Sequence, residues 1–209
     1  MTEDEARSWI VRHCGADPMM RLEHYAGLLL DEAARQNLVA ASTLPTLWAR
    51  HLVDSAQLLG LAPPPIGKGE WIDIGSGAGL PGLVIALASD WRVTLVEPRK
   101  LRVAFLARCI DTLGLAGRVT VEGSKVESIR RATSASVISA RAVAALPHLI
   151  ASAAHLADRD TVWLLPKGSR AQSEVAEARR SWQGVFHVKQ SVVDPDSGIV
   201  VASQVARRR

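Results

Sequence analysis

The feature that most constrains this chain is a run of glycines between an apolar stretch and a proline, Trp71-Ile-Asp-Ile-Gly-Ser-Gly-Ala-Gly-Leu-Pro-Gly82. The apolar residues 71–74 predict a buried strand, and the glycines permit positive φ and let the backbone come close to a ligand. Pro81 suits the first turn of a following helix, because the N–H that it lacks would be unpaired there anyway. That helix end offers free N–H groups. A strand, a tight turn and a helix start in this order predict a nucleotide site.

The spacing of the glycines indicates which nucleotide. The dinucleotide fingerprint is G-x-G-x-x-G, and counted from Gly75 its third glycine falls on Leu80, so that fit fails. Gly75, Gly77 and Gly79 instead form G-x-G-x-G with an acid, Asp73, two residues upstream. This arrangement resembles motif I of class I methyltransferases, which use S-adenosylmethionine. An ordinary glycine turn is the alternative.

A second apolar run supports a nucleotide site. Residues 92–97 are rich in β-branched side chains and end in the carboxylate of Glu97, which predicts another buried strand. Glu97 lies about twenty residues past the glycine loop, the spacing at which an acid holds ribose hydroxyls. An ionised carboxylate only accepts hydrogen bonds, and a ribose diol offers two donors. A solvated acid at a strand end is the alternative, and we interpret Glu97 as the ribose ligand.

Length and patterning favour one α/β domain with an appendage. The chain has 209 residues, of which 48% are hydrophobic, enough for a full core. Residues 3–60 predict helices, most clearly 43–59, where apolar residues recur at i, i+3 and i+4, and 61–70 reads as a linker. Strands are expected over 71–74, 92–97, 118–122, 136–140, 161–165, 185–192 and 198–205, and helices near 79–89, 99–113, 143–157 and 170–182.

The last two strands flank the turn sequence Asp194-Pro-Asp-Ser-Gly198 and should pair as an antiparallel hairpin. Seven strands ending in a hairpin match the Rossmann-like class I methyltransferase sheet, with an N-terminal helical extension over 1–62 and a core domain over 63–209. Ligands of such sheets bind beyond the carboxyl ends of the strands, near the point where strand order reverses. That rule gathers 73–80, 97–98, 123–127 and 139–141 on one rim, joined by 167–168.

Charge and composition exclude several classes of protein. The net charge of +4 is mild, although basic clusters such as 99–108 are suited to phosphates; solvated helix faces are the alternative. No apolar run approaches the ~20 residues of a membrane span, and the acidic start lacks a signal-peptide pattern. Cys14 and Cys109 form no metal or redox motif, and the six histidines show no ligand spacing. We expect a cytoplasmic protein that binds no metal.

Five motifs, taken together and in the order in which they occur, are more specific than the glycine loop alone. They are Arg50-His-Leu-Val-Asp-Ser55, Asp73-Ile-Gly-Ser-Gly-Ala-Gly-Leu-Pro-Gly82, Lys125-Val-Glu127, Ser139-Ala-Arg-Ala-Val143 and Pro166-Lys-Gly168. Together they resemble the bacterial ribosomal RNA small subunit methyltransferase G family, also called glucose-inhibited division protein B. The resemblance covers nearly the whole chain. It departs from the family at residues 32–34, where many members carry Trp-Asn-Lys and this chain has Glu-Ala-Ala.

The resemblance implies methyl transfer from S-adenosylmethionine to N7 of one guanine in the decoding region of 16S rRNA, so that the partner is 16S rRNA or a small ribosomal subunit precursor. Carried over by motif, the cofactor contacts fall on Gly75, Leu80, Val126, Glu127 and Arg141. The glycine spacing adds Gly77 and Gly79, and the ribose argument adds Glu97. Guanine N7 has a lone pair and no proton to lose, so we expect no general base and no catalytic residue in that sense.

Three cations are candidates for RNA contact: Arg102, Lys125 and Lys167, the last with an exposed strand-end lysine as its alternative. Three further side chains have structural interpretations. His51 is expected to be a core histidine, Asp54 to pair with Arg50 at i, i+4, and Arg141 to need a carboxylate partner, for which Glu127 is the candidate on the same rim. We expect a monomer.

Three other functions stay open at this point. A class I methyltransferase for a small molecule or a protein would bind the same cofactor but leave 16S rRNA unmethylated. An NAD(P)-binding oxidoreductase is disfavoured by Leu80. An inactive RNA-binding module would bind rRNA and turn over no cofactor.

Overall fold

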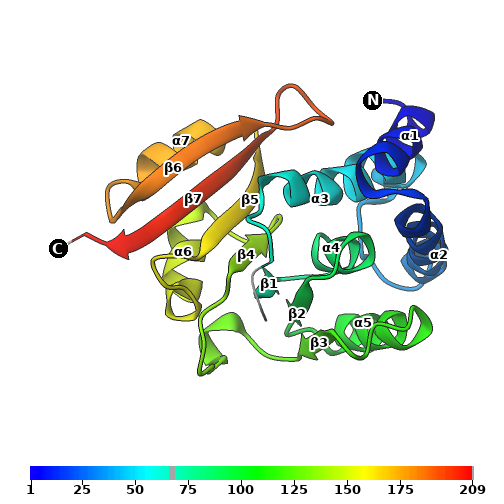
Figure 1. The fold of residues 1–209 in the computed structure, drawn as a ribbon, viewed down its shortest axis with the longest axis horizontal. Helices are drawn as coiled ribbons and strands as arrows, with labels where there is room; N and C mark the ends of the chain where they lie inside the picture. Colours follow the sequence, from blue (N-terminus) through cyan, green and yellow to red (C-terminus); the bar gives the residue numbers. More distant parts are fainter. Residues whose placement is uncertain (66–68, 209) are drawn as a thin grey trace.

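A seven-stranded sheet of order β3-β2-β1-β4-β5-β7-β6 forms the centre of the computed structural model, which describes residues 1–65 and 69–208 (Figure 1). The strands are β1 Glu70–Ile74, β2 Arg92–Val96, β3 Val119–Glu122, β4 Val137–Ala140, β5 Val162–Gly168, β6 Trp182–Gln190 and β7 Gly198–Arg207. Strands β1 to β5 run parallel to one another, and β7 is antiparallel to both β5 and β6. The predicted seven-stranded sheet with a C-terminal antiparallel hairpin is confirmed.

Helices cover both faces of this sheet (Figure 1). They are α1 Glu3–Cys14, α2 Ala16–Ala33, α3 Asp54–Ala56, α4 Gly82–Ala88, α5 Lys100–Thr112, α6 Leu146–Ala153 and α7 Ala171–Ala178. Short helical turns of other kinds are η1 Ala41–Thr46, η2 Trp48–Val53, η3 Gln57–Leu61, η4 Val126–Ser128 and η5 Ala154–Leu156. Because parallel strands covered on both faces are buried, their sequences read as continuous apolar runs, which is why the strand predictions fall close to the observed bounds.

The predicted continuous helix over 43–59 is wrong in its detail. The segment consists of a 3-10 turn (η1), a π turn (η2), one turn of α-helix (α3) and a second 3-10 turn (η3). Pro45 lies inside η1 and has no N–H to give to a regular helix. At the start of η2 the carboxylate of Glu3 accepts hydrogen bonds from the N–H groups of Trp48 and Ala49, each at 3.0 Å, which satisfies donors that a helix start leaves free.

Two buried clusters hold the layers together. One joins side chains of the N-terminal helices, such as Ile10 and Leu22, to Trp71 of β1, Leu83 of α4 and Phe105 of α5. The other lies beneath α6 and α7 on the opposite face. The predicted extension over 1–62 therefore packs into the same cluster as the sheet and its helices α4 and α5. This packing brings residues 38–54 to the carboxyl edge of the sheet.

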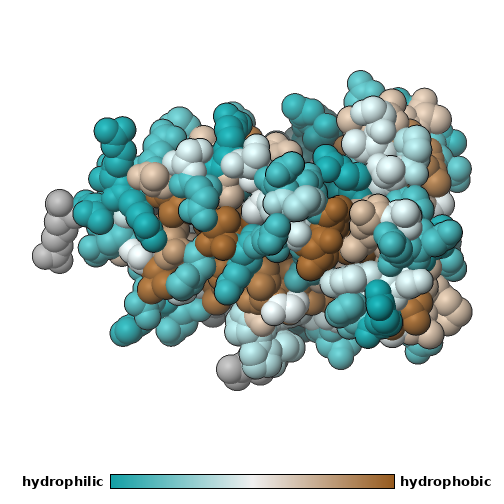
Figure 2. Space-filling view, turned by 90° about the horizontal axis from the view of Figure 1, so that it is seen from above, coloured by the Kyte–Doolittle hydropathy of each residue, from teal (hydrophilic) through white to brown (hydrophobic). Residues whose placement is uncertain are grey.

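Hydrophilic side chains dominate the face seen from above, and the most hydrophobic ones gather toward its middle (Figure 2). In the part of the chain that the structure describes, no helix has both the length and the apolar character that a membrane crossing requires. The predicted linker 61–70 lies partly outside the described residues, at 66–68.

Candidate functional site

The glycine loop after β1 adopts the backbone that its sequence predicts. Gly75, Gly77 and Gly79 have φ of 66°, 56° and 95°, a region that is costly for residues with a Cβ. The N–H groups of Gly75 and Ser76 both donate to the carbonyl of Val96, at 2.8 and 3.1 Å. These bonds hold the loop against the end of β2. Pro81 occupies the N-cap position of α4, one residue earlier than a place inside the first turn.

Asp73 supports this loop from below. Its buried carboxylate accepts hydrogen bonds from the Ser139 hydroxyl at 2.7 Å and from the Gly82 N–H at 3.1 Å. Burial raises the pKa of Asp73 to about 6, because desolvation disfavours the charged form. The side chain thereby joins β1, β4 and the first residue of α4.

Gly82 is a residue that the sequence interpretation missed. A Cβ at this position would lie 2.3 Å from Leu95 Cδ2 and 2.9 Å from the Asp73 Cβ, so α4 can pack this closely on the sheet only with glycine there. Counted from Gly77, the chain reads G-x-G-x-x-G through Gly79 and Gly82. The count from Gly75, which placed the third glycine at Leu80, overlooked this match, and glycine spacing alone does not separate a dinucleotide from S-adenosylmethionine.

Glu97, the expected ribose ligand, lies directly against the glycine loop. Its side chain is buried, and its carboxylate accepts hydrogen bonds from the Gly77 N–H at 3.0 Å and the Arg99 N–H at 2.9 Å. Arg102 Nη1 lies 3.8 Å from Oε2 of Glu97. A carboxylate has about four lone-pair sites, so the two backbone donors leave acceptor capacity for a ligand.

A cavity of about 480 Å³ opens above this loop at the carboxyl edge of the sheet. Three groups of residues line it: the N-terminal segment with Leu38–Ala40, Thr43, Arg50, His51 and Asp54; the loops after β1 and β4 with Gly75–Ala78, Leu80, Arg141 and Ala142; and the end of β5 with the β6–β7 turn, from Pro166 and Gly168 to Ser191, Val193, Asp194, Ser197, Gly198 and Ile199. Arg102 completes the lining.

Some of the predicted site residues line this cavity and others do not. Gly75, Gly77, Leu80, Arg141 and Arg102 belong to the lining. The described lining does not include Gly79, Glu97, Lys125, Val126 and Glu127. Of the latter, Glu97 lies against the glycine loop, as described above. Lys125 is the N-cap residue of η4, which begins with the buried Val126 and the exposed Glu127.

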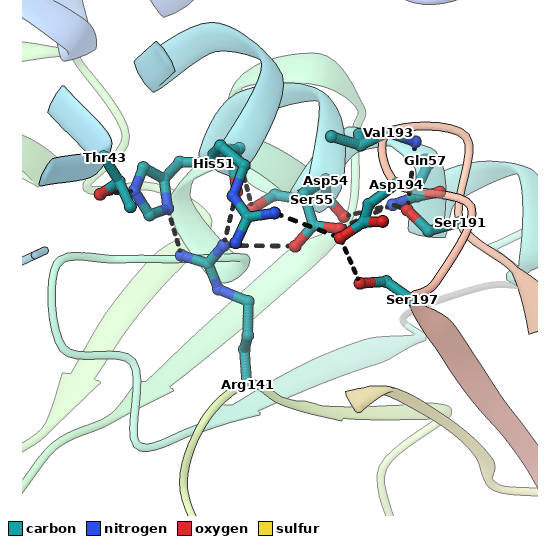
Figure 3. Close-up of polar contacts among 11 residues, drawn as sticks. Thr43, His51, Asp54, Ser55, Gln57, Arg141, Ser191, Val193, Asp194 and Ser197 are labelled. Atoms are coloured by element: carbon teal, nitrogen blue, oxygen red, sulfur yellow. Dashed lines mark hydrogen bonds and ion pairs between the residues drawn. The ribbon is translucent and has the colours of Figure 1, made fainter. Parts of the chain in front are cut away.

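Arg141 anchors a polar network among residues that line the cavity (Figure 3). Its Nη1 lies 3.3 Å from Asp54 Oδ2 and 3.2 Å from the carbonyl oxygen of Arg50, and its Nη2 lies 3.0 Å from His51 Nδ1. The expected partnership of Arg141 with Glu127 is therefore wrong, because Asp54 holds that place. The expected pairing of Asp54 with Arg50 is also wrong, since Arg50 pairs with Asp194 at 3.3 Å.

The β6–β7 turn is fixed to the N-terminal segment by the same network. Gln57 Nε2 donates to Asp54 Oδ1 at 2.9 Å and to the Ser191 hydroxyl at 3.1 Å, and Gln57 Oε1 accepts from the Val192 N–H at 2.9 Å. Asp194 in turn accepts from the Ser197 hydroxyl at 3.0 Å. The sequence signal for these contacts was the Arg-His-x-x-Asp-Ser motif, whose partners could not be read from it.

Two further expectations need correction or refinement. Lys167 does not face solvent: its side chain is 9% exposed, its ammonium pairs with Glu174 at 3.0 Å and donates to the carbonyl of Ala144. The same Glu174 carboxylate accepts from the Leu146 N–H at 2.8 Å, so Lys167 holds the loop that precedes α6. His51 is buried as expected of a core histidine, but it also lines the cavity.

The charges in the cavity are balanced. Each of its three arginines lies within 4 Å of a carboxylate, Arg50 near Asp194, Arg102 near Glu97 and Arg141 near Asp54. His51 adds no charge near neutral pH, since burial and the neighbouring Arg141 and Arg50 lower its pKa to about 4. The cavity is therefore suited to a ligand that carries charges of both signs.

Comparison with known proteins agrees with this architecture. A family model described as rRNA small subunit methyltransferase G matches residues 19–198. A protein of that name from Rhizorhabdus wittichii is 48% identical over 100% of this chain and 95% of its own length. Another from Novosphingobium aromaticivorans is 49% identical over 100% of this chain and 91% of its own.

Solved structures give the same fold at low sequence identity. A glycopeptide N-methyltransferase in complex with S-adenosylmethionine has a TM-score of 0.61 and 12% identity over 74% of this chain and 94% of that one. A structure from Methanococcus maripaludis, described as an S-adenosylmethionine-dependent methyltransferase, has a TM-score of 0.59 and 14% identity over 86% of this chain and 92% of that one. On the family model and the two relatives, this chain belongs to the ribosomal RNA small subunit methyltransferase G family.

Proposed function

We propose that this protein transfers a methyl group from S-adenosylmethionine to N7 of a guanine in the decoding region of 16S rRNA. The observation that carries the proposal is the cavity in which the glycine loop and Arg141 meet beside Glu97, at the point where strand order reverses. Open α/β sheets bind ligands at such a point. The names of the relatives supply the substrate class, and the guanine atom comes from the resemblance of the motifs.

The residues present fit the cofactor. An ideal Cβ on Gly77 would meet nothing closer than 3.6 Å, so glycine leaves room above the loop for a ligand. Glu97 would accept the ribose hydroxyls, Gly75, Gly79 and Leu80 would shape the loop, and Val126 with Glu127 would flank the adenine. When bound, the cofactor supplies a methyl group on a positively charged sulfur.

The reaction mainly requires that the protein position the reacting atoms. Guanine N7 has a free lone pair, so no side chain has to remove a proton, and holding the reacting atoms in line can supply ~7–11 kcal/mol. The methylated base is cationic, and the arginines that line the cavity already have acidic partners. This balance lowers repulsion between the protein and the product.

The RNA would approach the carboxyl edge of the sheet. Arg99, Lys100 and Lys125 are exposed there, and exposed cations supply sequence-independent affinity for phosphate. Deep A-form grooves hide N7, so the target base must lie in a loop or be splayed out. Arg102 faces Glu97, and Lys167 pairs internally, so we propose Lys125 as the RNA contact among the three expected cations. A monomer acting in the cytoplasm is part of this proposal.

The test is methyl transfer to small ribosomal subunits and to free 16S rRNA from a strain that lacks this enzyme. The expected product is N7-methylguanine, mapped by chemical cleavage at the modified base. Calorimetry with S-adenosylhomocysteine and with NADH distinguishes the oxidoreductase alternative. Binding of NADH alone would falsify the methyltransferase proposal. Binding of S-adenosylhomocysteine without methylation of either RNA substrate would point to another methyl acceptor.

A further inference from the structure

Two side chains of the N-terminal segment, Thr43 and His51, line the cavity beside Arg141 and have no role in the function proposed above. We propose that they form a hydrogen-bonded chain that positions the Arg141 guanidinium for the carboxylate at the amino-acid end of the cofactor. His51 and Thr43 are then positioning residues, since they act through Arg141. The inference rests on the proposed function, because it takes S-adenosylmethionine as the ligand.

The contacts define the protonation state of the imidazole. Arginine has donors only, so His51 Nδ1, which lies 3.0 Å from Arg141 Nη2, must present its lone pair. The proton of the neutral ring is then on Nε2, which lies 2.7 Å from the Thr43 hydroxyl. That hydroxyl donates its own proton to the carbonyl of Ala40 at 2.7 Å and therefore accepts from Nε2. The hydrogen bonds from Arg141 to Ala40 therefore all run in a single direction, and Figure 3 shows Thr43, His51 and Arg141 side by side.

A neutral acceptor fixes a guanidinium without cancelling its charge. His51 is buried, which favours the uncharged ring. Arg141 uses Nη1 for Asp54 and the Arg50 carbonyl and one N–H of Nη2 for His51. Of its five N–H groups, the Nε–H and one N–H of Nη2 then remain for a ligand. Paired N–H groups of arginine match the two oxygens of a carboxylate.

The place of Arg141 indicates which part of the cofactor it meets. Ala140 of β4 lies in register with Ile74 of β1, so Arg141 and Gly75 leave adjacent strands at the same level. Glu97 follows β2 on the other side of β1. With ribose at Glu97, the sulfur and the amino-acid end would extend across β1 toward β4. The carboxylate of that end would therefore meet Arg141.

The first test measures the tautomer of His51 by nitrogen-15 NMR of the ligand-free protein. We expect a neutral ring protonated on Nε2 at pH 7. Thr43→Val removes the acceptor for Nε2–H and should raise the fraction of the other tautomer, whereas Thr43→Ser keeps the hydroxyl and should leave the spectrum unchanged. A wild-type ring protonated on Nδ1 would overturn the proposal, since it could not accept from Arg141.

The second test compares two ligands by calorimetry: S-adenosylhomocysteine and its decarboxylated analogue. His51→Ala should weaken S-adenosylhomocysteine about tenfold, because one hydrogen bond that orients a charged group is lost, and should leave the analogue unchanged. His51→Asn keeps an acceptor for Arg141 and should recover part of the affinity. His148→Ala, at an exposed histidine outside this cavity, is the matched control and should bind both ligands as the wild type does.

The outcomes separate this inference from the proposed function. Equal losses for both ligands in His51→Ala would show a general structural effect and overturn the positioning role. If His51→Ala does not fold, the same comparison is made with Thr43→Val, for which equal affinities of Thr43→Val and wild type for S-adenosylhomocysteine would overturn it. Failure of the wild type to bind either ligand would instead contradict the proposed function, whatever the tautomer of His51.

Discussion

The Glu97 carboxylate and the Gly77 N–H are joined by a 3.0 Å hydrogen bond across 20 residues of sequence. The acid that is expected to hold the ribose therefore also holds the loop on which the ribose would lie. A change at Glu97 should therefore affect both the affinity for the cofactor and the geometry of the loop.

Glu97→Gln should weaken the binding of S-adenosylhomocysteine about tenfold to a hundredfold, since hydrogen bonds to a charged group contribute about 1.5–3 kcal/mol. The amide nitrogen of glutamine would face the N–H of either Gly77 or Arg99, donor against donor. Calorimetry measures the effect. Glu122→Gln, at an exposed acid at the end of β3, is the control, and equal affinities in the two variants would contradict a ribose role for Glu97.

Gly77→Ala should fold and lose cofactor binding. The ideal Cβ has no neighbour closer than 3.6 Å, so the change costs only the roughly 1–2 kcal/mol of a left-handed backbone, while the methyl group enters the space above the loop. Gly114→Ala has a similar φ of +66° and open surroundings, and it controls for the backbone cost. Unchanged cofactor affinity in Gly77→Ala would place the ligand elsewhere.

Gly82→Ala should destabilise the fold by about 1–3 kcal/mol, the usual cost of overpacking a core. The added Cβ would lie 2.3 Å from Leu95. Gly27→Ala in α2 meets nothing within 4 Å and should stabilise the protein by up to about 1 kcal/mol, because alanine is the better helix former. Chemical denaturation measures both changes, and equal stabilities of the two variants would argue against close packing at residue 82.

Asp73 and His51 should give opposite pH dependences of stability. The folded pKa of Asp73 is about 6 against an ordinary value of 3.8, so its contribution is present below pH 3.8 and is lost as the pH rises to 6. The folded pKa of His51 is about 4 against 6.5, so its contribution is present above pH 6.5 and is lost as the pH falls to 4. Each shift corresponds to about 3 kcal/mol.

Between pH 4 and 6 these two contributions nearly cancel, and the free energy of unfolding of the wild type should change little on their account. Asp73→Asn should leave a free energy of unfolding that rises with pH in this range, and His51→Asn one that falls. Urea denaturation at several pH values measures both slopes. Parallel curves for the two variants would contradict the opposite titrations.

Lys167→Met should destabilise the fold and leave RNA binding unchanged. The variant leaves the Glu174 carboxylate, 11% exposed, without its ammonium partner, and a broken buried pair costs about 3–5 kcal/mol. Lys125→Ala, at an exposed position, should instead reduce the salt dependence of RNA binding by about one phosphate contact. Filter binding at several salt concentrations distinguishes them, and a reduced slope in Lys167→Met would restore Lys167 to the RNA surface.

Local patterns in the sequence predicted the sheet and the loop well, because their causes are local. Apolar runs gave the parallel strands, the residues 194–198 gave the hairpin turn, and the glycines gave the positive φ values. The helical pattern over 43–59 failed in detail because a 3.6-residue repeat does not distinguish one α-helix from a series of 3-10, π and α turns.

The partners of charged side chains could not be predicted, because they come from distant parts of the chain. Asp54 and Arg141 are 87 residues apart, and no spacing rule connects them. The expectation that Lys167 is exposed failed for a different reason. The pairing of β5 with β7 changes register between Pro166 and Gly168, and such irregularities redirect a side chain. The exposed lysine expected at a strand end thereby becomes an internal one.

The contact between Arg50 and Asp194 spans 144 residues, and it has a consequence for the newly made protein. At about 5–20 residues per second, a ribosome needs roughly 7–30 s to travel from one partner to the other. During that interval the glycine loop is made, while the wall that the β6–β7 turn gives to the cavity does not yet exist. A chain released before the hairpin is made would thus lack one wall of the site, because the cavity is lined in part by residues 191–199.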